Sequence, residues 1–412
     1  MQLLELNDLN LSWYGGASHV QEPGAALVED GSAVYGSKAL ARARVAPRGF
    51  QDQHWQFLNS DSLAVSAPGV QNNADLIYRH LQELAERTNP DTKPKGLICA
   101  VPGTVSNEQL GLLLGIANEA GIEISSFVHS ASLYCLNIPL PSEAWCLDVQ
   151  NRRGLLTRLL RDDAGLHVAE TLELLQLGMN GLIDGWMHQL TDQFVARSRF
   201  DPLRVAETEQ QLFDQVRAWL PLGGPLQAAV DHREHQRAVD LSFEEAAGRA
   251  QQRYREAQQK LPAQATVVLT PNASTLPGLS TYLSGHGHSV LKAEANDLWS
   301  NAQNCLELSN PEAVHFITSL ATNTATTQAP AESQHATHAL QNNIAVPLAS
   351  LAKKLATLAG SKDLGFQVSA PSDGVTINGT QRTTQQSLSP GDRLSVGDQD
   401  YICIRVDHGP TA

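Results

Sequence analysis

The sequence feature that most constrains the fold is a strand–helix–strand unit within Lys95–Asn137. Leu97–Val101 is an unbroken apolar run of strand length, which is typical of a strand covered on both faces. Ser106 and Gln109 have the spacing of a capping box, which satisfies the free amides at the start of a helix. Gly121 ends the helical pattern, and a second apolar strand follows. Two strands joined by a helix imply a parallel pair with a right-handed crossover.

The composition is that of an ordinary globular protein with an acidic balance. The chain has 412 residues, 42% hydrophobic and 17% charged, and a formal net charge of −14. This charge argues against nucleic acid and anionic membrane surfaces as partners, and no apolar run approaches the roughly 20 residues that span a bilayer. The N-terminus, MQLLELNDLN, has no basic region and no cleavage signal, so we expect no export and a cytoplasmic location. The five cysteines are scattered without a Cys-x-x-Cys pair, which favours buried free thiols and no metal centre.

Hairpin signals precede helical patterns twice along the chain. The first hairpins lie within Leu3–Tyr35, before an amphipathic helix, and the second within Leu155–Leu172, before a long helical tract. Residues 321–343 form a predicted linker, because most of this stretch consists of Thr, Ala, Gln, Asn and Ser without an apolar period. We predict that residues 344–412 form a short helix, Ile344–Leu358, followed by a small β-module rich in glycine turns.

The order of these elements resembles the nucleotide-binding domain of DnaK-type heat-shock chaperones, within the actin and sugar-kinase superfamily. Ala100-Val101-Pro102 with Ala117–Ile122 resembles the family's "valine-proline-alanine … alanine-glycine-leucine" segment, and Leu177–Leu182 resembles its "leucine-glycine-glycine" turn into a helix. The similarity covers residues 2–320, about three quarters of the chain. It implies an α/β fold with two actin-like lobes of duplicated ribonuclease-H-like topology, residues 1–143 and 144–320, around an ATP site.

In that family, two glycine-rich turns cradle the phosphates of ATP, because a residue without a Cβ lets the backbone approach closely. The corresponding turns here are Glu5–Asn10 and Asp148–Arg153, and the adenosine loop corresponds to Thr270–Pro277. None of these three segments has the family's glycines, and no lysine stands between Lys38 and Lys93 to replace the family's phosphate lysine. The resemblance places these residues at a nucleotide site: Glu5, Asn7, Asp148, Asn151, Arg152, Arg153, Gly178, Asn272 and Ser274. Asp148 is the catalytic carboxylate if the site is active.

The missing glycines favour a chaperone-like pseudo-ATPase scaffold that binds other proteins and uses no cofactor. A single electrostatic donor commonly supplies ~2.7–4 kcal/mol of transition-state stabilisation, so the combined loss of the lysine, the hydroxyls and the close amides is expected to abolish turnover. Two alternatives stay open. In one, Arg152 and Arg153 contact phosphate in place of the lysine, and the chain is a chaperone-like ATPase that uses ATP and Mg²⁺. In the other, the chain is an actin-like assembly or polymerising factor.

Gly178 and the C-terminal module each allow two interpretations. A glycine turn at a helix start is an anion site in principle, and it is also a packing feature. Residues 374–398 resemble the second half of a forkhead-associated domain, through turns such as Asn378-Gly379 and Pro390-Gly391-Asp392. That family's phosphothreonine-binding residues have no counterpart upstream of these turns. We therefore expect the module to contact proteins without binding a phosphorylated residue.

Overall fold

The computed structural model describes the chain in two compact units, Met1–Thr322 and Asn323–Ala412. In the first unit the described residues are 2–15, 18–88, 96–303, 305 and 314–321. In the second they are 338–341, 344–348, 350, 358–361, 365–368, 375–377, 386–388, 392–396 and 399–404. The protein is a mixed α/β chain, as the sequence predicts. No helix in these ranges is both long enough and apolar enough to cross a bilayer.

The first sheet is built around the predicted strand–helix–strand unit, which the structure confirms. Its strands stand in the order β18 (Phe316–Ile317), β10 (Ile124–His129), β9 (Leu97–Val101), β1 (Gln2–Glu5), β2 (Leu11–Gly15) and β3 (Ser18–Glu22). β9 pairs in parallel with both β1 and β10, whereas β2 pairs antiparallel with β1 and β3. The helix α4 (Asn107–Glu119) crosses from β9 to β10 and begins with the predicted capping box of Ser106 and Gln109.

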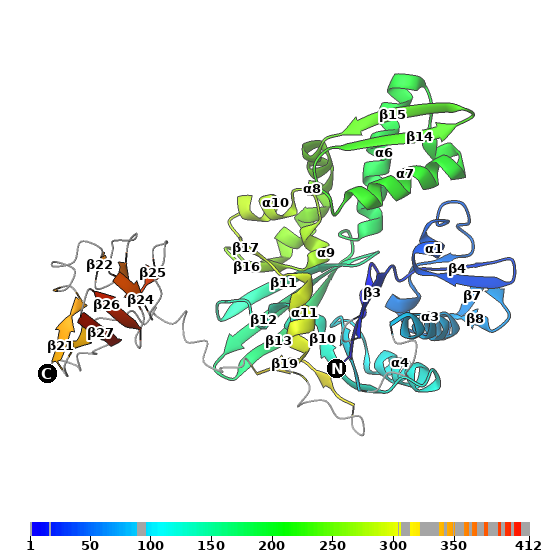
Figure 1. Ribbon diagram of the computed structural model, residues 1–412. Coiled ribbons are helices and arrows are strands. Elements are labelled where there is room, and N and C mark those ends of the chain that lie inside the picture. The colour runs from blue at the N-terminus through cyan, green and yellow to red at the C-terminus, as the bar shows by residue number, and fades with distance from the viewer. Residues whose placement is uncertain are drawn as a thin grey trace. The chain divides into compact units, whose positions relative to one another are not determined.

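The second sheet repeats the topology of the first. Its order is β17 (Ser289–Lys292), β16 (Thr266–Leu269), β11 (Glu143–Val149), β12 (Gly154–Asp162), β13 (Gly165–Leu174) and β19 (Ser319–Leu320). Again three antiparallel strands form a meander, and two later strands join the free side of the first strand in parallel. β18 and β19 follow each other along the chain, yet each closes a different sheet. Both sheets are visible side by side in Figure 1.

Each sheet carries an insertion between its third and fourth strands. The first comprises β4 (Ala26–Glu29), β5 (Ser32–Tyr35), α1 (Gly36–Leu40), β6 (Phe50–Gln51), α2 (His54–Phe57), β7 (Ser62–Ala67), β8 (Val70–Asn72) and α3 (Asn73–Thr88). The second comprises α6 (Met179–Ser198), η1 (Pro202–Arg204), α7 (Ala206–Trp219), β14 (Leu226–His232), β15 (His235–Leu241) and α8 (Phe243–Lys260). α6, α7 and the β14–β15 hairpin extend together away from the second sheet in Figure 1.

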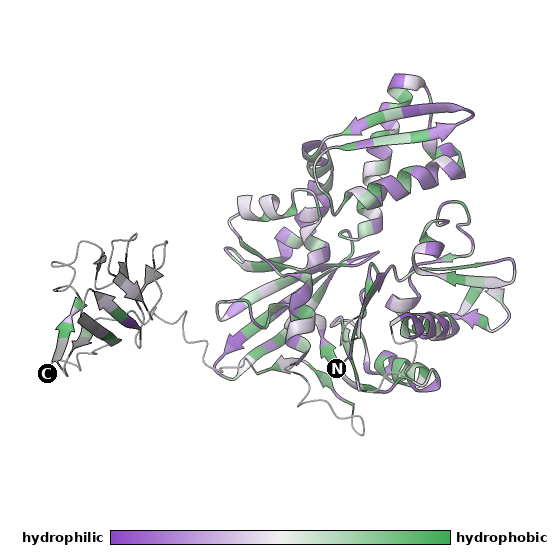
Figure 2. Ribbon diagram, viewed as in Figure 1, coloured by the Kyte–Doolittle hydropathy of each residue, from purple (hydrophilic) through white to green (hydrophobic). Residues whose placement is uncertain are grey.

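The core is divided by the two faces of each strand, because successive side chains of a strand point to opposite sides. In the first sheet, Leu4 and Cys99 pack toward α3 and α4, whereas Leu3 and Ile98 pack toward the second sheet. Val268 of β16 belongs to this shared core. The short helices α5 (Ser130–Cys135) and α11 (Ala295–Ala302) also contribute to it. Green, hydrophobic residues are frequent along the strands of both sheets in Figure 2, because both faces of these strands are covered.

The second unit is a β-structure, and the helix predicted at Ile344–Leu358 is wrong at both of its ends. Ile344–Pro347 is the strand β21, and β22 (Leu358–Ser361) begins where the helix was expected to end; residues 351–357 lie outside the described ranges. β21 pairs with β20 (His338–Gln341), which falls inside the predicted linker. The physical reason is Pro347, which lacks an amide hydrogen and clashes with the preceding turn of a helix.

The remaining strands of this unit complete two sheets. They are β23 (Gly365–Val368), β24 (Val375–Ile377), β25 (Gln386–Ser387), β26 (Arg393–Val396) and β27 (Gln399–Ile404). Their orders are β21-β20-β27-β26-β24 and β22-β23-β25. The predicted turns at Asn378-Gly379 and Pro390-Gly391 lie outside the described residues. The predicted small β-module is therefore present between β20 and β27.

Candidate functional site

The turn after β1 and the turn after β11 contact each other directly. These are the two turns that the sequence resemblance assigns to phosphate binding. The side-chain amide of Asn7 donates one hydrogen bond to Asp148 Oδ2 (2.9 Å) and another to the carbonyl of Val149 (3.1 Å). Its Oδ1 accepts from the backbone amide of Leu9 at 2.9 Å, which holds the side chain in place. Asn7 therefore links the two sheets and is only 2% exposed.

A second set of hydrogen bonds runs in the opposite direction across the same junction. The backbone amide of Asn151 donates to Asp8 Oδ1 at 2.9 Å, and its side-chain amide donates to the carbonyl of Asp8 at 2.9 Å. That carbonyl also accepts from the amide of Gly24 at 2.9 Å. A Cβ on Gly24 would lie 2.8 Å from the same oxygen, so only glycine allows this approach. Four side chains of the two turns are thus engaged with each other.

The start of α6 packs against the second turn and uses its first amides there. Met179 N donates to the carbonyl of Gln150 at 3.0 Å, and Asn180 N donates to the carbonyl of Asn151 at 2.9 Å. Gly178 is the N-cap residue, and a Cβ on it would lie 2.3 Å from the carbonyl carbon of Arg152. The free amides of a helix start can bind an anion, but at α6 backbone carbonyls occupy two of them.

The third segment named by the sequence, Thr270–Pro277, approaches the junction through α9 (Pro271–Ser274). Thr270 Oγ1 donates to Asp148 Oδ1 at 2.6 Å, so both carboxylate oxygens of Asp148 accept hydrogen bonds. Asn272 accepts from the side-chain amide of Asn10 at 3.1 Å. Ser274 is not part of this contact, because its hydroxyl donates to the carbonyl of Pro271 in its own turn (2.8 Å).

Both arginines of the second turn have acidic partners. Arg152 donates to the two carboxylate oxygens of Asp52 at 2.9 and 3.2 Å. Arg153 is 7% exposed, forms an ion pair with Glu173, and also donates to Gln150 and to Thr104 at 2.8 and 2.9 Å. Their guanidinium groups therefore serve contacts within the protein.

Two carboxyl groups at or beside the junction, those of Glu5 and Asp8, are buried and that of Asp148 is half-buried; desolvation raises the pKa of each. The pKa of Glu5 rises to about 8 despite a hydrogen bond from Tyr134, and that of Asp8 rises to about 7 despite the Asn151 amide. The pKa of Asp148 rises to about 6, with desolvation outweighing the hydrogen bond from Thr270. Within the described residues, no group of three or more His, Cys, Asp or Glu side chains is placed to hold a metal ion.

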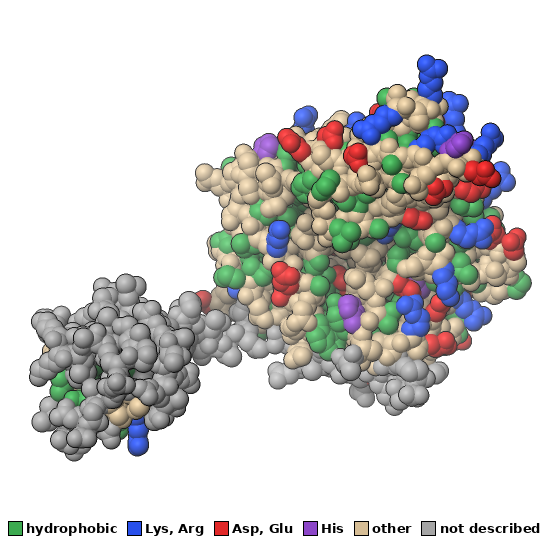
Figure 3. Space-filling model, turned by 45° about the horizontal axis from the view of Figure 1, so that its top comes forward, with side chains coloured by type: hydrophobic (Ala, Val, Ile, Leu, Met, Phe, Trp, Pro, Cys, Tyr) green, Lys and Arg blue, Asp and Glu red, His purple; other side chains and the backbone are tan. Residues whose placement is uncertain are grey.

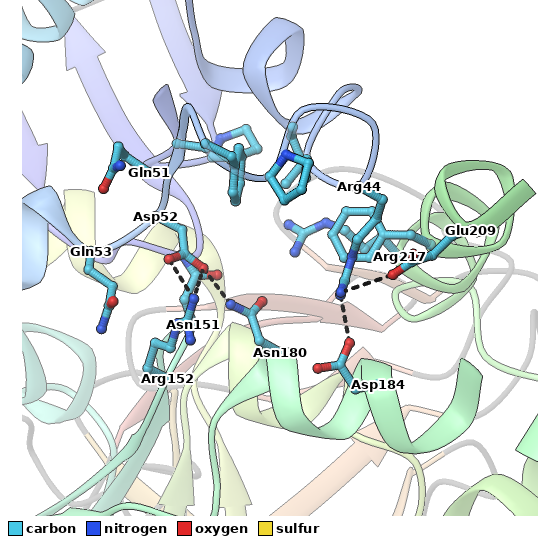
Figure 4. Close-up of a pocket in the computed structure, with 17 residues that line it drawn as sticks. Arg44, Gln51, Asp52, Gln53, Asn151, Arg152, Asn180, Asp184, Glu209 and Arg217 are labelled. Atoms are coloured by element: carbon cyan, nitrogen blue, oxygen red, sulfur yellow. Dashed lines mark hydrogen bonds and ion pairs between the residues drawn. The ribbon is translucent and has the colours of Figure 1, made fainter. Parts of the chain in front are cut away.

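A cavity of about 370 Å³ adjoins the junction, between the first insertion and the helices α6 and α7. One end is closed by Arg152 and Asn180, which both donate to Asp52 (Figure 4). At the other end, Arg44 forms ion pairs with Asp184 (2.6 Å) and with Glu209 (3.4 Å).

Arg217 extends into this cavity between the two ends (Figure 4). Its guanidinium carbon lies 5.7 Å from the centre of the Phe213 ring. Burial lowers the pKa of Arg217 to about 10, against the opposing pull of Asp214 and Asp52. The cavity therefore holds a mixture of charges in which arginines and carboxylates largely neutralise each other.

The structure brings together most, but not all, of the residues named from the sequence. Asn7, Asp148 and Asn151 lie in one hydrogen-bonded junction, and Gly178 packs on its edge. Other residues complete it: Asp8, Asn10 and Thr270 lie in segments that the sequence assigned to the site but were not named as site residues, and Asp52 and Asn180 were missed. Asp8 stands in the first turn and carries a turn-forming carboxylate, which is a signal that could have identified it. Asp52 has no such signal, because its partner Arg152 is 100 positions away.

The sequence matches no protein-family model and no curated protein.

The close packing of Gly178 leads to a test of the junction. We expect Gly178→Ala to lower the free energy of unfolding by about 1–3 kcal/mol, because the added methyl group overlaps the Arg152 backbone and forces a shift. Chemical denaturation measures this change. Gly111→Ala in α4 is the matched control, since nothing lies within 4 Å of its Cβ, and it should stabilise the helix by about 0.5–1 kcal/mol. Equal effects of the two changes would contradict the packing described here.

The raised pKa of Glu5 leads to a pH dependence. Between its ordinary pKa of 4.5 and about 8, the folded protein keeps a proton that the unfolded chain releases, so this contribution to stability falls as the pH rises. We expect the free energy of unfolding to fall between about pH 4.5 and 8, and to fall less in Glu5→Gln, which cannot ionise and still accepts from Tyr134. Denaturation curves across this range measure both slopes. Glu119→Gln, at an exposed position, should leave the wild-type slope unchanged; parallel slopes for Glu5→Gln and wild type would refute the explanation.

Proposed function

We propose that this chain is a catalytically silent, chaperone-like scaffold of the actin and heat-shock superfamily, which binds protein partners and does not turn over ATP. The repeated sheet topology supports the superfamily assignment. Each sheet consists of a three-strand meander followed by two parallel strands, with an insertion after the third strand. This is the order that a duplicated ribonuclease-H-like fold requires, and it agrees with the resemblance between residues 2–320 and a two-lobed ATPase.

The observation that carries the proposal is the hydrogen bonding between the two turns. In a working ATPase of this kind, the backbone amides of the turns point at phosphate oxygens. Here the amide of Asn151 is bound to Asp8, and the side chains of Asn7 and Asn151 extend from one turn to the other. A phosphate group at this place would have to break these bonds and leave buried polar groups without partners, at about 1–3 kcal/mol for each group.

The contacts of the arginines and of Asp148 favour the silent scaffold over the ATPase alternative. Arg152 and Arg153 already bind Asp52 and Glu173, so contact with a phosphate would require breaking internal ion pairs. A magnesium ion needs carboxylate oxygens as ligands, whereas both oxygens of Asp148 already accept hydrogen bonds, from Asn7 and from Thr270. The residues at the junction therefore do not fit ATP and magnesium.

A scaffold role agrees with the division of the chain into two compact units. The first unit, Met1–Thr322, has several hydrophobic core clusters around its two sheets, whereas the described residues of the second form short strands in two sheets. Inter-domain linkers and separate folded modules are common in proteins that hold several partners at once. We propose that partner proteins bind to surfaces of the first unit and to the C-terminal module.

Isothermal titration calorimetry with ATP and MgCl₂ tests this function. We expect no saturable binding up to about 1 mM ATP, which corresponds to an affinity of roughly −4 kcal/mol. Thermal unfolding with and without the nucleotide is a second measurement, because a ligand of the folded state raises the midpoint. Asp148→Asn is the matched variant: saturable binding to the wild type that Asp148→Asn abolishes would overturn the proposal in favour of the ATPase.

A further inference from the structure

A second cavity lies between α6 and α8, away from the junction of the turns. Its volume is about 330 Å³, and it is lined by Gln176, Leu182, Gly185, Trp186, Arg249, Ala250, Gln252 and Arg253. This set contains two arginines and no acidic side chain, although the whole chain has a net charge of −14. Acidic and basic side chains are interspersed over the face shown in Figure 3, so a groove with charge of one sign differs from that pattern.

The two arginines stand one helical turn apart on α8 and have no acidic partner. Residues four positions apart in a helix lie about 6 Å apart along its axis and share a face. None of the ion pairs among the described residues involves Arg249 or Arg253. The guanidinium of Arg253 is held by one hydrogen bond to the carbonyl of Gln176 at 2.8 Å, which leaves its other donors available. The nearby Glu256 accepts from the backbone amides of Leu175 and Gln176 instead.

Two glycines of α6 stand opposite these arginines in matching register. A Cβ on Gly181 would lie 2.7 Å from Nη1 of Arg253, and one on Gly185 would lie 3.9 Å from Nε of Arg249. Glycine in the interior of a helix weakens it, so two glycines at this spacing need a local reason. They provide the space in which both arginine side chains lie along α6, with their charged ends at the groove.

An exposed apolar side chain lies at one end of the groove. Leu175 is 71% exposed and directly precedes Gln176, whose carbonyl holds Arg253. The order along the surface is therefore Arg249, Arg253 and then Leu175. Two cationic positions followed by an apolar one are complementary to two carboxylates followed by an apolar side chain.

We propose that this groove binds a short, extended acidic segment of a partner protein. In an extended peptide, residues two positions apart point the same way and are separated by roughly 6.6 Å, which matches the spacing of the two arginines. Carboxylates and guanidinium groups form strong, charge-assisted hydrogen bonds. Two glutamates at positions i and i+2 bind Arg249 and Arg253, and an apolar residue at i+4 covers Leu175. This inference rests on the proposed function, because it names the class of partner that the scaffold recognises.

Fluorescence anisotropy of a labelled peptide, Ser-Glu-Ser-Glu-Ser-Leu, titrated with the full chain tests the groove. We expect saturable binding that weakens as the salt concentration rises. We expect Arg249→Gln alone to weaken it several-fold, and Arg249→Gln with Arg253→Gln about ten-fold or more, because each change removes a charged hydrogen-bond donor. Arg249→Gln leaves the fold intact, since Arg249 is exposed and makes no hydrogen bond within the described residues.

Arg255→Gln is the matched control, because it removes the same charge from the opposite, exposed face of α8. A peptide with glutamine in place of both glutamates controls for the carboxylates. No saturable binding, or an equal loss of binding in Arg255→Gln, would overturn the inference. So would displacement of the peptide by inorganic phosphate at the concentration of the peptide itself, which would indicate a general anion site. Failure here is distinguishable from failure of the proposed function, because ATP calorimetry reports on the turns and leaves the groove untouched.

Discussion

The hydrogen bonds between Asn7, Asp8, Asp148 and Asn151 determine how the two sheets of the first unit are joined. In each sheet a turn follows the first strand, β1 or β11. The backbone groups of either turn would need water or a ligand as partners if the other turn were absent. Because the turns face each other, the amides of one satisfy the carbonyl and carboxyl groups of the other. The first amides of α6 are satisfied in the same way by the carbonyls of the second turn. The protein thus supplies from its own chain the partners that a bound anion would otherwise provide.

This arrangement has an electrostatic consequence. Glu5 and Asp8 are buried and Asp148 is half-buried beside them, and desolvation raises the pKa of all three. A bound divalent cation would favour their ionised forms, whereas the hydrogen bonds that Asp8 and Asp148 accept do not outweigh the effect of desolvation. Asp8 illustrates the balance: its Oδ1 accepts from Asn151, but Oδ2 is buried without a hydrogen-bond partner among the described residues. A junction of this kind is more stable when its carboxyl groups keep their protons, which is the opposite of what magnesium binding requires.

Local patterns predicted the elements of the first unit, but not the contacts between distant elements. The strand Leu97–Val101 and the capping box at Ser106 depend on neighbouring residues, and both are present in the structure. The helix predicted from Ile344 is wrong because the prediction followed the apolar residues of this stretch and gave too little weight to Pro347, which disfavours a helix. The bond between Arg152 and Asp52 joins residues 100 positions apart, and no periodicity or motif encodes such a pair. The family resemblance placed Asn7 and Asp148 at the same site, but the hydrogen bond between their side chains is visible only in the structure.

Two pairs of arginines in this chain differ in whether their guanidinium groups have acidic partners within the protein. Arg152 and Arg153 stand in a turn at the centre of the unit, where Asp52, Gln150 and Glu173 satisfy them. Arg249 and Arg253 stand on an outer helix face, where two glycines of α6 make room and where neither arginine forms an ion pair with a described carboxylate. An unpaired arginine at the surface loses little hydration, so its charge remains available for a partner. The internal pair stabilises the joint between the sheets, and the external pair gives that rigid frame a place of defined charge at which an acidic segment can bind.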